Sequence, residues 1–195
     1  MTTICVFCSS SEMISRHYLD LASNLGTEIA GRGHSLVTGG GSVSMMGAIA
    51  RSVRAGGGYT IGVIPRALFD KEIADHDADE LVVVETMRER KATMDARCDA
   101  FITLPGGIGT LEELFEIWTA RTLGMHDKPV VILDPDGLFD HVRQQLDVLV
   151  SQGFLRAGAL EAMVWTSTVE EAVILAESSG SAPPLDEGEL LESEL

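Results

Sequence analysis

The segment of the sequence best suited to chemistry runs Pro105-Gly106-Gly107-Ile108-Gly109-Thr110-Leu111-Glu112-Glu113. It joins an apolar run to a helical pattern, so its glycines fall where a strand passes into a helix. Glycines let a backbone approach a ligand closely, and the N–H groups at a helix start attract phosphate. A structural alternative makes Thr110 the N-cap and Glu113 the third residue of a capping box. That alternative leaves three glycines in four positions unexplained, so we expect a phosphate-binding loop here.

This loop does not match the common nucleotide fingerprints. It has no Gly-Lys-Ser/Thr sequence, so it is not a P-loop. The first predicted strand ends in Ser9-Ser10-Ser11 rather than in G-x-G-x-x-G, which disfavours a conventional dinucleotide site.

Two further segments have residue types suited to an anionic ligand. Gly39-Gly40-Gly41-Ser42 also lies between a predicted strand and a predicted helix. The segment Met87-Arg88-Glu89-Arg90-Lys91 is basic within an acidic chain. A solvated helix surface is the structural alternative for it, and a role for Arg90 and Lys91 facing an anion is at least as well supported.

Hydrophobic periodicity predicts an alternation of short strands and longer helices. The predicted strands are continuous apolar runs, which indicates burial on both faces, as in a parallel sheet covered by helices. We expect strands at 4–7, 35–38, 60–64, 81–84, 100–104, 130–133 and 163–165, and helices at 18–29, 45–53, 87–97, 111–123, 138–150 and 169–176.

The predicted fold class is therefore α/β, with a Rossmann-like open parallel sheet and helices on both faces. Residues 1–178 form a single catalytic domain, and residues 179–195 are expected to be a disordered acidic tail. Ligands of such sheets bind beyond the carboxyl ends of the strands. The loops described above all lie at that edge.

Composition narrows the functional classes. The 195 residues include 30 acidic and 14 basic ones, for a net charge of −16, and residues 1–178 carry −11 of it. The negative electrostatic potential of such a chain repels nucleic acid and anionic membranes, so we expect neither as a partner. No apolar run approaches the length of a membrane helix. The first residues lack the basic region of a signal peptide, so we expect none. Three cysteines are too few for a disulfide scaffold, which favours the cytoplasm.

Cys5 and Cys8 are formally a C-x-x-C pair. Redox pairs of this kind sit at a helix start, whereas these two residues fall on a predicted strand and should point to opposite faces. We expect buried thiols.

Three motifs together resemble one family: Gly39-Gly40-Gly41-x5-Gly47, Met87-x-x-Arg90-Lys91 and Pro105-Gly106-Gly107-x-Gly109-Thr110-x-x-Glu113. This pattern is similar to the LONELY GUY family of cytokinin riboside 5′-monophosphate phosphoribohydrolases, whose members have often been labelled possible lysine decarboxylases. The resemblance spans roughly residues 3–176.

The resemblance implies a homodimer with sites near its interface, and it identifies Arg90 and Glu113 as the catalytic pair. It requires no cofactor and no metal. The predicted substrate contacts are Gly40, Gly41, Ser42, Glu72, Met87, Lys91, Gly106, Gly107, Ile108, Gly109, Thr110, Leu111, Glu112 and Thr119. The chain departs from the family at Arg88, where a His is usual, at Thr38, and at Ser44-Met45-Met46, where the family has Gly-Leu.

The implied reaction is hydrolysis of the N-glycosidic bond of N6-modified adenosine 5′-monophosphates. Glu113 would stabilise the oxocarbenium-like state and activate water, and Arg90 would supply charge and orientation. Lysine decarboxylation is disfavoured, since none of the three lysines lies in a convincing Schiff-base site. The alternative function is a non-catalytic carrier of a nucleotide or phosphorylated cofactor. A dimeric scaffold acting through its acidic tail would leave both glycine loops unexplained.

Overall fold

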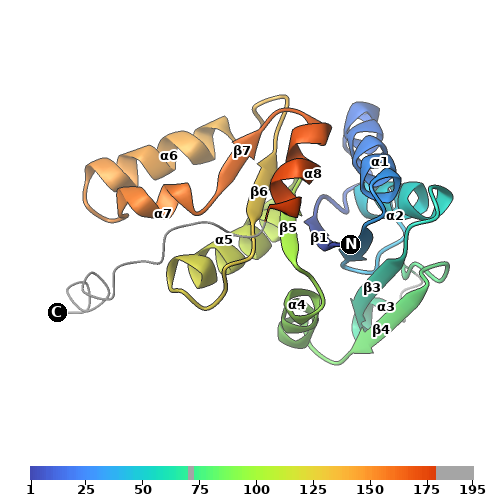
Figure 1. Cartoon of the computed structure of the whole chain (residues 1–195). Helices are drawn as coiled ribbons and strands as arrows, with labels where there is room; N and C mark the ends of the chain where they lie inside the picture. Colours follow the sequence, from blue (N-terminus) through green and yellow to red (C-terminus); the bar gives the residue numbers. More distant parts are fainter. Residues whose placement is uncertain (70–72, 179–195) are drawn as a thin grey trace.

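The computed structural model of the chain describes residues 1–69 and 73–178. In this part of the chain, seven strands form one sheet in the order β4-β3-β2-β1-β5-β6-β7, and every pair of neighbours is parallel (Figure 1). The predicted Rossmann-like sheet is confirmed. The strands are β1 (Thr3–Phe7), β2 (Ser35–Thr38), β3 (Thr60–Pro65), β4 (Glu80–Val84), β5 (Ala100–Thr103), β6 (Val130–Leu133) and β7 (Val164–Thr166).

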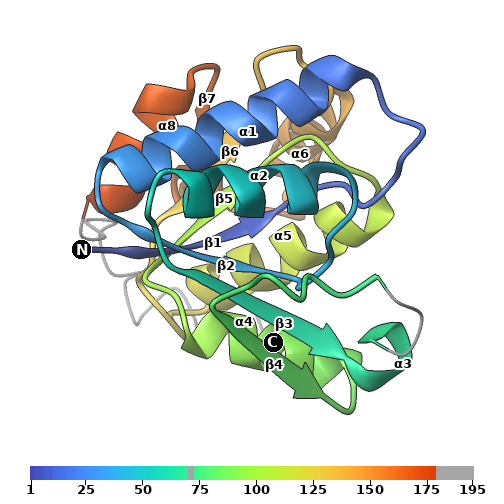
Figure 2. The ribbon, with the colours of Figure 1, turned by 90° about the vertical axis from the view of Figure 1, so that its right-hand side faces the viewer.

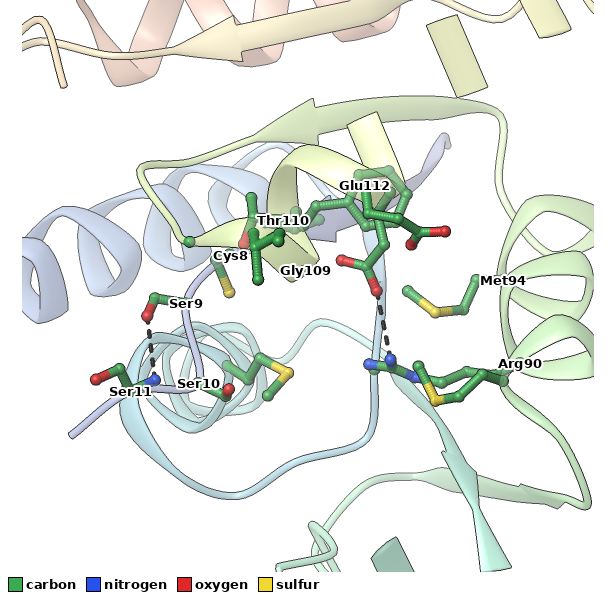
Figure 3. Close-up of a pocket in the computed structure, with 17 residues that line it drawn as sticks. Cys8, Ser9, Ser10, Ser11, Arg90, Met94, Gly109, Thr110 and Glu112 are labelled. Atoms are coloured by element: carbon green, nitrogen blue, oxygen red, sulfur yellow. Dashed lines mark hydrogen bonds and ion pairs between the residues drawn. The ribbon is translucent and has the colours of Figure 1, made fainter. Parts of the chain in front are cut away.

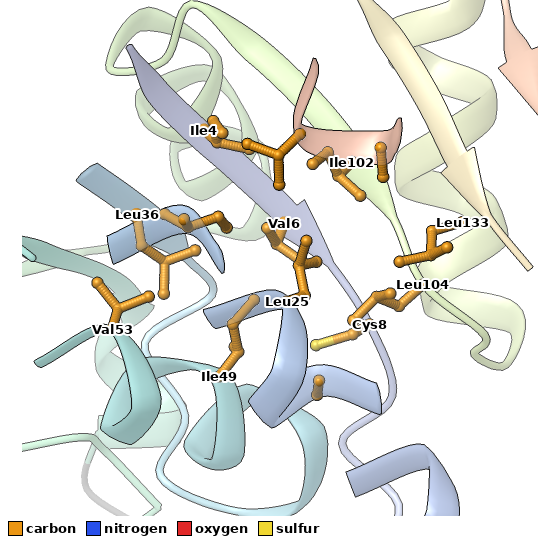
Figure 4. Packing of buried hydrophobic residues seen from close by; sticks show 14 of the residues in the cluster. Ile4, Val6, Cys8, Leu25, Leu36, Ile49, Val53, Ile102, Leu104 and Leu133 are labelled. Carbon is orange, nitrogen blue, oxygen red and sulfur yellow. The ribbon is translucent and has the colours of Figure 1, made fainter. Parts of the chain in front are cut away.

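Alternate residues of the strands feed two hydrophobic cores, one on each face of the sheet. Within β1, Ile4 and Val6 point into the first core, whereas Cys5 and Phe7 point into the second. Figure 4 shows the first core, where Ile4 and Val6 of β1 are followed by Cys8, just after the strand. All three cysteines are free and buried, as predicted for Cys5 and Cys8, and these two lie on opposite faces.

The helices divide between the two faces in the same way (Figure 2). The first core is covered by α1 (Arg16–Gly31), α2 (Ser44–Ala55) and α8 (Val169–Glu177), and the second by α4 (Met87–Ala96), α5 (Ile108–Thr122), α6 (Asp140–Ser151) and α7 (Ala157–Glu161). A single turn, α3 (Arg66–Phe69), follows β3. None of the helices in the described residues is long and apolar enough to cross a membrane.

The strand order reverses between β1 and β5. The chain runs from β1 outward through β2, β3 and β4, and then returns to β5 on the other side of β1. Connections that diverge from neighbouring strands leave a crevice beyond their carboxyl ends, where ligands of this fold bind. The loops that follow β1 and β5 therefore face each other across this crevice.

One local interpretation of the sequence is wrong. Helix α5 begins at Ile108 rather than Leu111, its N-cap is Gly107, and no side chain caps it. The reason is that the N–H of Leu111 already bonds to the carbonyl of Gly107, which closes the first turn earlier than predicted. Thr110 is thus inside the helix, and the capping-box alternative for Thr110 and Glu113 does not hold.

A capping box does exist at the start of α4. The Thr86 hydroxyl accepts a hydrogen bond from the Glu89 N–H, and the Glu89 carboxylate accepts one from the Thr86 N–H. The helices α3 and α7 were not predicted, because four or five residues are too few to show a helical period. The predicted acidic tail, residues 179–195, lies outside the described residues.

Candidate active site

A cavity of about 320 Å³ opens at the crevice between β1 and β5 (Figure 3). Its walls come from five segments: the end of β1 with the serines that follow it, the residue after β2, helix α2, helix α4, and the loop and first turns of α5. Of the residues predicted to act on the substrate, those that line it are Met87, Arg90, Gly107, Ile108, Gly109, Thr110, Glu112 and Glu113. The fold thus brings together two motifs that are about 20 residues apart in the sequence.

Arg90 and Glu113 form an ion pair in the wall of this cavity. The distance from Arg90 Nη1 to Glu113 Oε1 is 3.3 Å, and the two side chains are only 10% and 12% exposed. Arg90 reaches the pair from α4 and Glu113 from α5. The two helices lie on the same face of the sheet, so the pairing follows from the fold and not from local sequence.

Two features of the site shift the pKa of the Glu113 carboxyl in opposite directions. Burial raises the pKa of its carboxyl above the ordinary value, and the charge of Arg90 partly offsets that rise. A carboxylate whose pKa is raised in this way is a stronger base than an exposed one. Burial also raises the pKa of the Cys8 thiol in the same cavity, so that thiol is not a candidate nucleophile.

The segment from the end of β5 into the first turn of α5, which contains Gly106, Gly107 and Gly109 and is called the glycine loop below, leaves its backbone open toward the cavity. A Cβ atom on Gly107 or Gly109 would meet nothing within 4 Å, so neighbouring protein atoms do not require glycine at these two positions. Gly106 differs, because its Cβ would lie 2.6 Å from Thr110 Cβ. The start of α5 has no side-chain cap, and its first N–H groups are therefore available to a ligand.

The serines after β1 form the wall opposite the glycine loop (Figure 3). Ser9 Oγ accepts a hydrogen bond from the Ser11 N–H at 3.1 Å, and the Ser44 hydroxyl donates to the Ser11 carbonyl at 2.6 Å. Ser44 holds this contact with φ of 51°, which is uncommon for a residue other than glycine. The sequence places these serines among the strand ends where a ligand is expected, but they are not among the substrate contacts that the family resemblance implies.

Lys91 and Thr119 line a second cavity, of about 340 Å³, on the far side of Glu113. Lys91 forms ion pairs with Glu112 and Glu116, and hydrogen bonds to these carboxylates raise the pKa of its ammonium group. Phe7 and Glu113 belong to the walls of both cavities. Eight of the predicted substrate contacts therefore line two adjoining cavities that share the Glu113 side chain.

Of the predicted contacts in the described residues, five line neither cavity: Gly40, Gly41, Ser42, Gly106 and Leu111. The Ser42 N–H donates to the Ile73 carbonyl, Gly41 pairs with Ala74, and the Gly40 carbonyl accepts from the Asp75 N–H. These three residues thus bind the segment 73–75 and do not line either cavity. Leu111 packs against the second core. Glu72 lies outside the described residues.

Metal ligands are not clustered in the part of the chain that the structure describes. No group of three or more His, Cys, Asp or Glu side chains there is placed to hold an ion.

Comparison with known proteins gives close relatives over most of the chain. A family model described as possible lysine decarboxylase matches residues 46–175. The cytokinin riboside 5′-monophosphate phosphoribohydrolase of Mycobacterium tuberculosis is 52% identical over 171 residues, which cover 88% of this chain and 91% of that protein. The enzyme of the same name, LOG3, from Arabidopsis thaliana is 44% identical over 170 residues, covering 87% and 79%.

Solved structures share the fold at lower identity. The molybdenum cofactor binding protein of Rippkaea orientalis superposes with a TM-score of 0.68 at 22% identity, covering 89% of this chain and 94% of that one. The molybdenum cofactor carrier protein of Chlamydomonas reinhardtii gives 0.67 at 25% identity, with the same coverage. These likenesses confirm the Rossmann-like architecture.

Proposed function

The chain belongs to the family of cytokinin riboside 5′-monophosphate phosphoribohydrolases, and from this premise we propose that it hydrolyses the N-glycosidic bond of N6-modified adenosine 5′-monophosphates. The products are the free base and ribose 5-phosphate. The observation that carries the proposal is the buried pair of Arg90 and Glu113 in the wall of the cavity that the glycine loop lines. A carrier protein has no need of a base held in this way.

In the proposed reaction, the open N–H groups at the start of α5 bind the 5′-phosphate. Glu113 lies one helical turn further along α5 and faces the ribose. Its carboxylate stabilises the positive charge that develops on the sugar and takes a proton from the attacking water. The base leaves with the electron pair of the N-glycosidic bond and takes up a proton from solvent. The charge of Arg90 favours the ionised form of Glu113, and the ion pair orients the carboxylate.

Lysine decarboxylation, the activity in the family model's description, fits the site poorly. A Schiff-base lysine must lose its proton to attack a cofactor. Lys91 instead pairs with two carboxylates that favour its charged form, and Lys128 pairs with Asp95 at 2.6 Å. Lys71 lies outside the described residues.

We further propose that the protein acts as a homodimer in the cytoplasm. Large apolar side chains are exposed around the two cavities: Ile108 is 90% exposed, Met125 75% and Leu123 54%. Exposed apolar residues grouped at a site favour a protein interface. Three free thiols fit a reducing compartment. Light scattering coupled to size-exclusion chromatography should give twice the chain mass of 20.9 kDa, and a monomer at micromolar concentration would contradict the dimer.

The test of the activity is release of free base from AMP and from isopentenyladenosine monophosphate, followed by chromatography. Glu113→Gln and Arg90→Ala should each lower kcat by about 10²–10⁴, the usual loss for one well-placed group. Glu161→Gln is the matched control, since Glu161 is an exposed carboxylate on α7. Near-normal turnover by Glu113→Gln would remove the mechanism. Tight binding of the nucleotide by the wild type without base release would favour the carrier function.

A further inference from the structure

Arg90 is an unusually enclosed cation for a protein whose other basic side chains are mostly exposed. It reaches the candidate active site from α4, and its residue is only 8% exposed. Besides the ion pair with Glu113, its Nε donates a hydrogen bond to the carbonyl of Val63, in β3, at 3.2 Å. The guanidinium group is thus held from two sides, by a helix carboxylate and by a strand carbonyl.

The guanidinium group also packs against the backbone of Gly39, which directly follows β2. A Cβ atom on Gly39 would lie 2.7 Å from Arg90 Cζ and closer still to Nη2. Real Cβ atoms do not approach other atoms so closely. The backbone of Gly39 is outside the left-handed region, so another residue could adopt its conformation. What excludes a side chain at position 39 is therefore the space that Arg90 occupies.

We propose that Gly39 is a positioning residue that seats the guanidinium group of Arg90 against Glu113. The proposal rests on the proposed function, because it takes the Arg90–Glu113 pair as catalytic. A methyl group at position 39 would push the guanidinium group away from Val63 and Glu113. Glu113 would then lose the charge that opposes the effect of its burial, and its orientation would change.

This role separates the first glycine of Gly39–Gly41 from the next residues. Gly40, Gly41 and Ser42 bind the backbone of the segment 73–75, whereas Gly39 lines the cavity and contacts Arg90. A motif that reads as one glycine-rich loop in the sequence therefore has two tasks in the fold. One fastens a neighbouring segment, and the other leaves room for a catalytic side chain.

The first test is kinetic. Gly39→Ala should lower kcat for base release by about 10–100-fold, because a displacement of about 1 Å at a catalytic group commonly costs that much. The KM should change less, since the glycine loop that binds the phosphate is untouched. Gly31→Ala is the matched control: Gly31 ends α1, has open space around its Cβ position, and should leave kcat unchanged.

The second test is a double-mutant cycle with Arg90→Ala. If Gly39 acts only through Arg90, adding Gly39→Ala to the Arg90→Ala variant should cause no further loss of kcat. Thermal unfolding gives a readout that needs no activity. Gly39→Ala should lower Tm by roughly 2–10 °C in the wild type, because the methyl group overpacks the site, and by nearly nothing when Arg90 is Ala.

The outcomes are distinguishable. Wild-type kcat and Tm for Gly39→Ala, or equal losses in both backgrounds, would overturn the positioning role. The Arg90→Ala background leaves room for the methyl group, so the cycle remains informative in Tm even where Gly39→Ala alone folds poorly. Absence of base release by the wild-type protein would instead overturn the proposed function, while the Tm cycle would still report whether Gly39 seats Arg90.

Discussion

Glu113 must keep a negative charge in a place that disfavours charge. Its side chain is 12% exposed, and this burial raises the pKa of the carboxyl above that of an exposed glutamate. Arg90 supplies the compensating charge at 3.3 Å. The net effect is a raised pKa, so the Glu113 carboxylate is more basic than that of an ordinary glutamate, which suits a base that activates water.

The pH dependence of kcat/KM should report this balance. The raised pKa of Glu113 means that the active, ionised form is lost as the pH falls through a value above the ordinary 4.5 of a glutamate. The acid limb should therefore lie above pH 4.5. Arg90→Ala removes the charge that lowers the pKa, so the Glu113 carboxyl should titrate at a still higher pH. Carbon-13 NMR of the Glu113 side chain measures this in both proteins, and an unchanged or lower pKa in Arg90→Ala would contradict the assignment.

At the scale of the element, the start of α4 controls where Arg90 and Lys91 are presented. The Glu89 carboxylate accepts hydrogen bonds from the N–H groups of Glu85 and Thr86, and Thr86 caps the helix in return. These contacts fix the first turn of a helix that has only two buried residues, Arg90 and Met94. The capping box therefore contributes more to the stability of α4 than it would to a helix with a broad apolar face.

Replacing Thr86 with Ala should destabilise the protein by about 1 kcal/mol, the usual cost of losing an N-cap side chain. Thr86→Ser keeps the hydroxyl and should be nearly neutral. Chemical denaturation of the three proteins measures the difference. Equal stability of the Ala and Ser variants would show that the box does not contribute.

The sequence predicted the elements better than it predicted their contacts. The strands at 35–38 and 130–133 were predicted with the bounds they have, because short apolar runs between glycine and proline turns are local signals. The start of α5 was misplaced by three residues, since the carbonyl of Gly107 caps the turn without any side chain. The partners of Gly40–Ser42 could not be predicted, because residues 73–75 bind them through backbone atoms that leave no trace in residue type.

The sequence also could not predict that Arg90 and Glu113 lie together. Arg90 and Glu113 were identified through motifs that resemble a family, but periodicity alone could not show that α4 and α5 cover the same face. The serines after β1 were predicted to lie at the ligand-binding edge of the sheet, but their position opposite the loop after β5 was not. Strand order decides which ends are neighbours, and that order arises from contacts between distant segments.

At the scale of the whole molecule, the net charge of −16 opposes any anionic substrate. A nucleotide must therefore be held by local features: the open N–H groups at the start of α5 and the Thr110 hydroxyl in the cavity wall. Lys91 adds little, because two glutamates neutralise it. Binding energy from the phosphate is then available to orient the ribose against Glu113.

The enzyme should consequently require the 5′-phosphate. Adenosine should be a poorer substrate than AMP by roughly 10² or more in kcat/KM, since several charge-assisted hydrogen bonds are lost together. Ribose 5-phosphate should inhibit competitively, whereas ribose at the same concentration should not. The measurement is base release from adenosine and AMP under identical conditions, with either sugar added. Comparable kcat/KM for adenosine and AMP would contradict phosphate binding at α5, and would leave Gly107 and Gly109 as parts of a turn that any small residues could make.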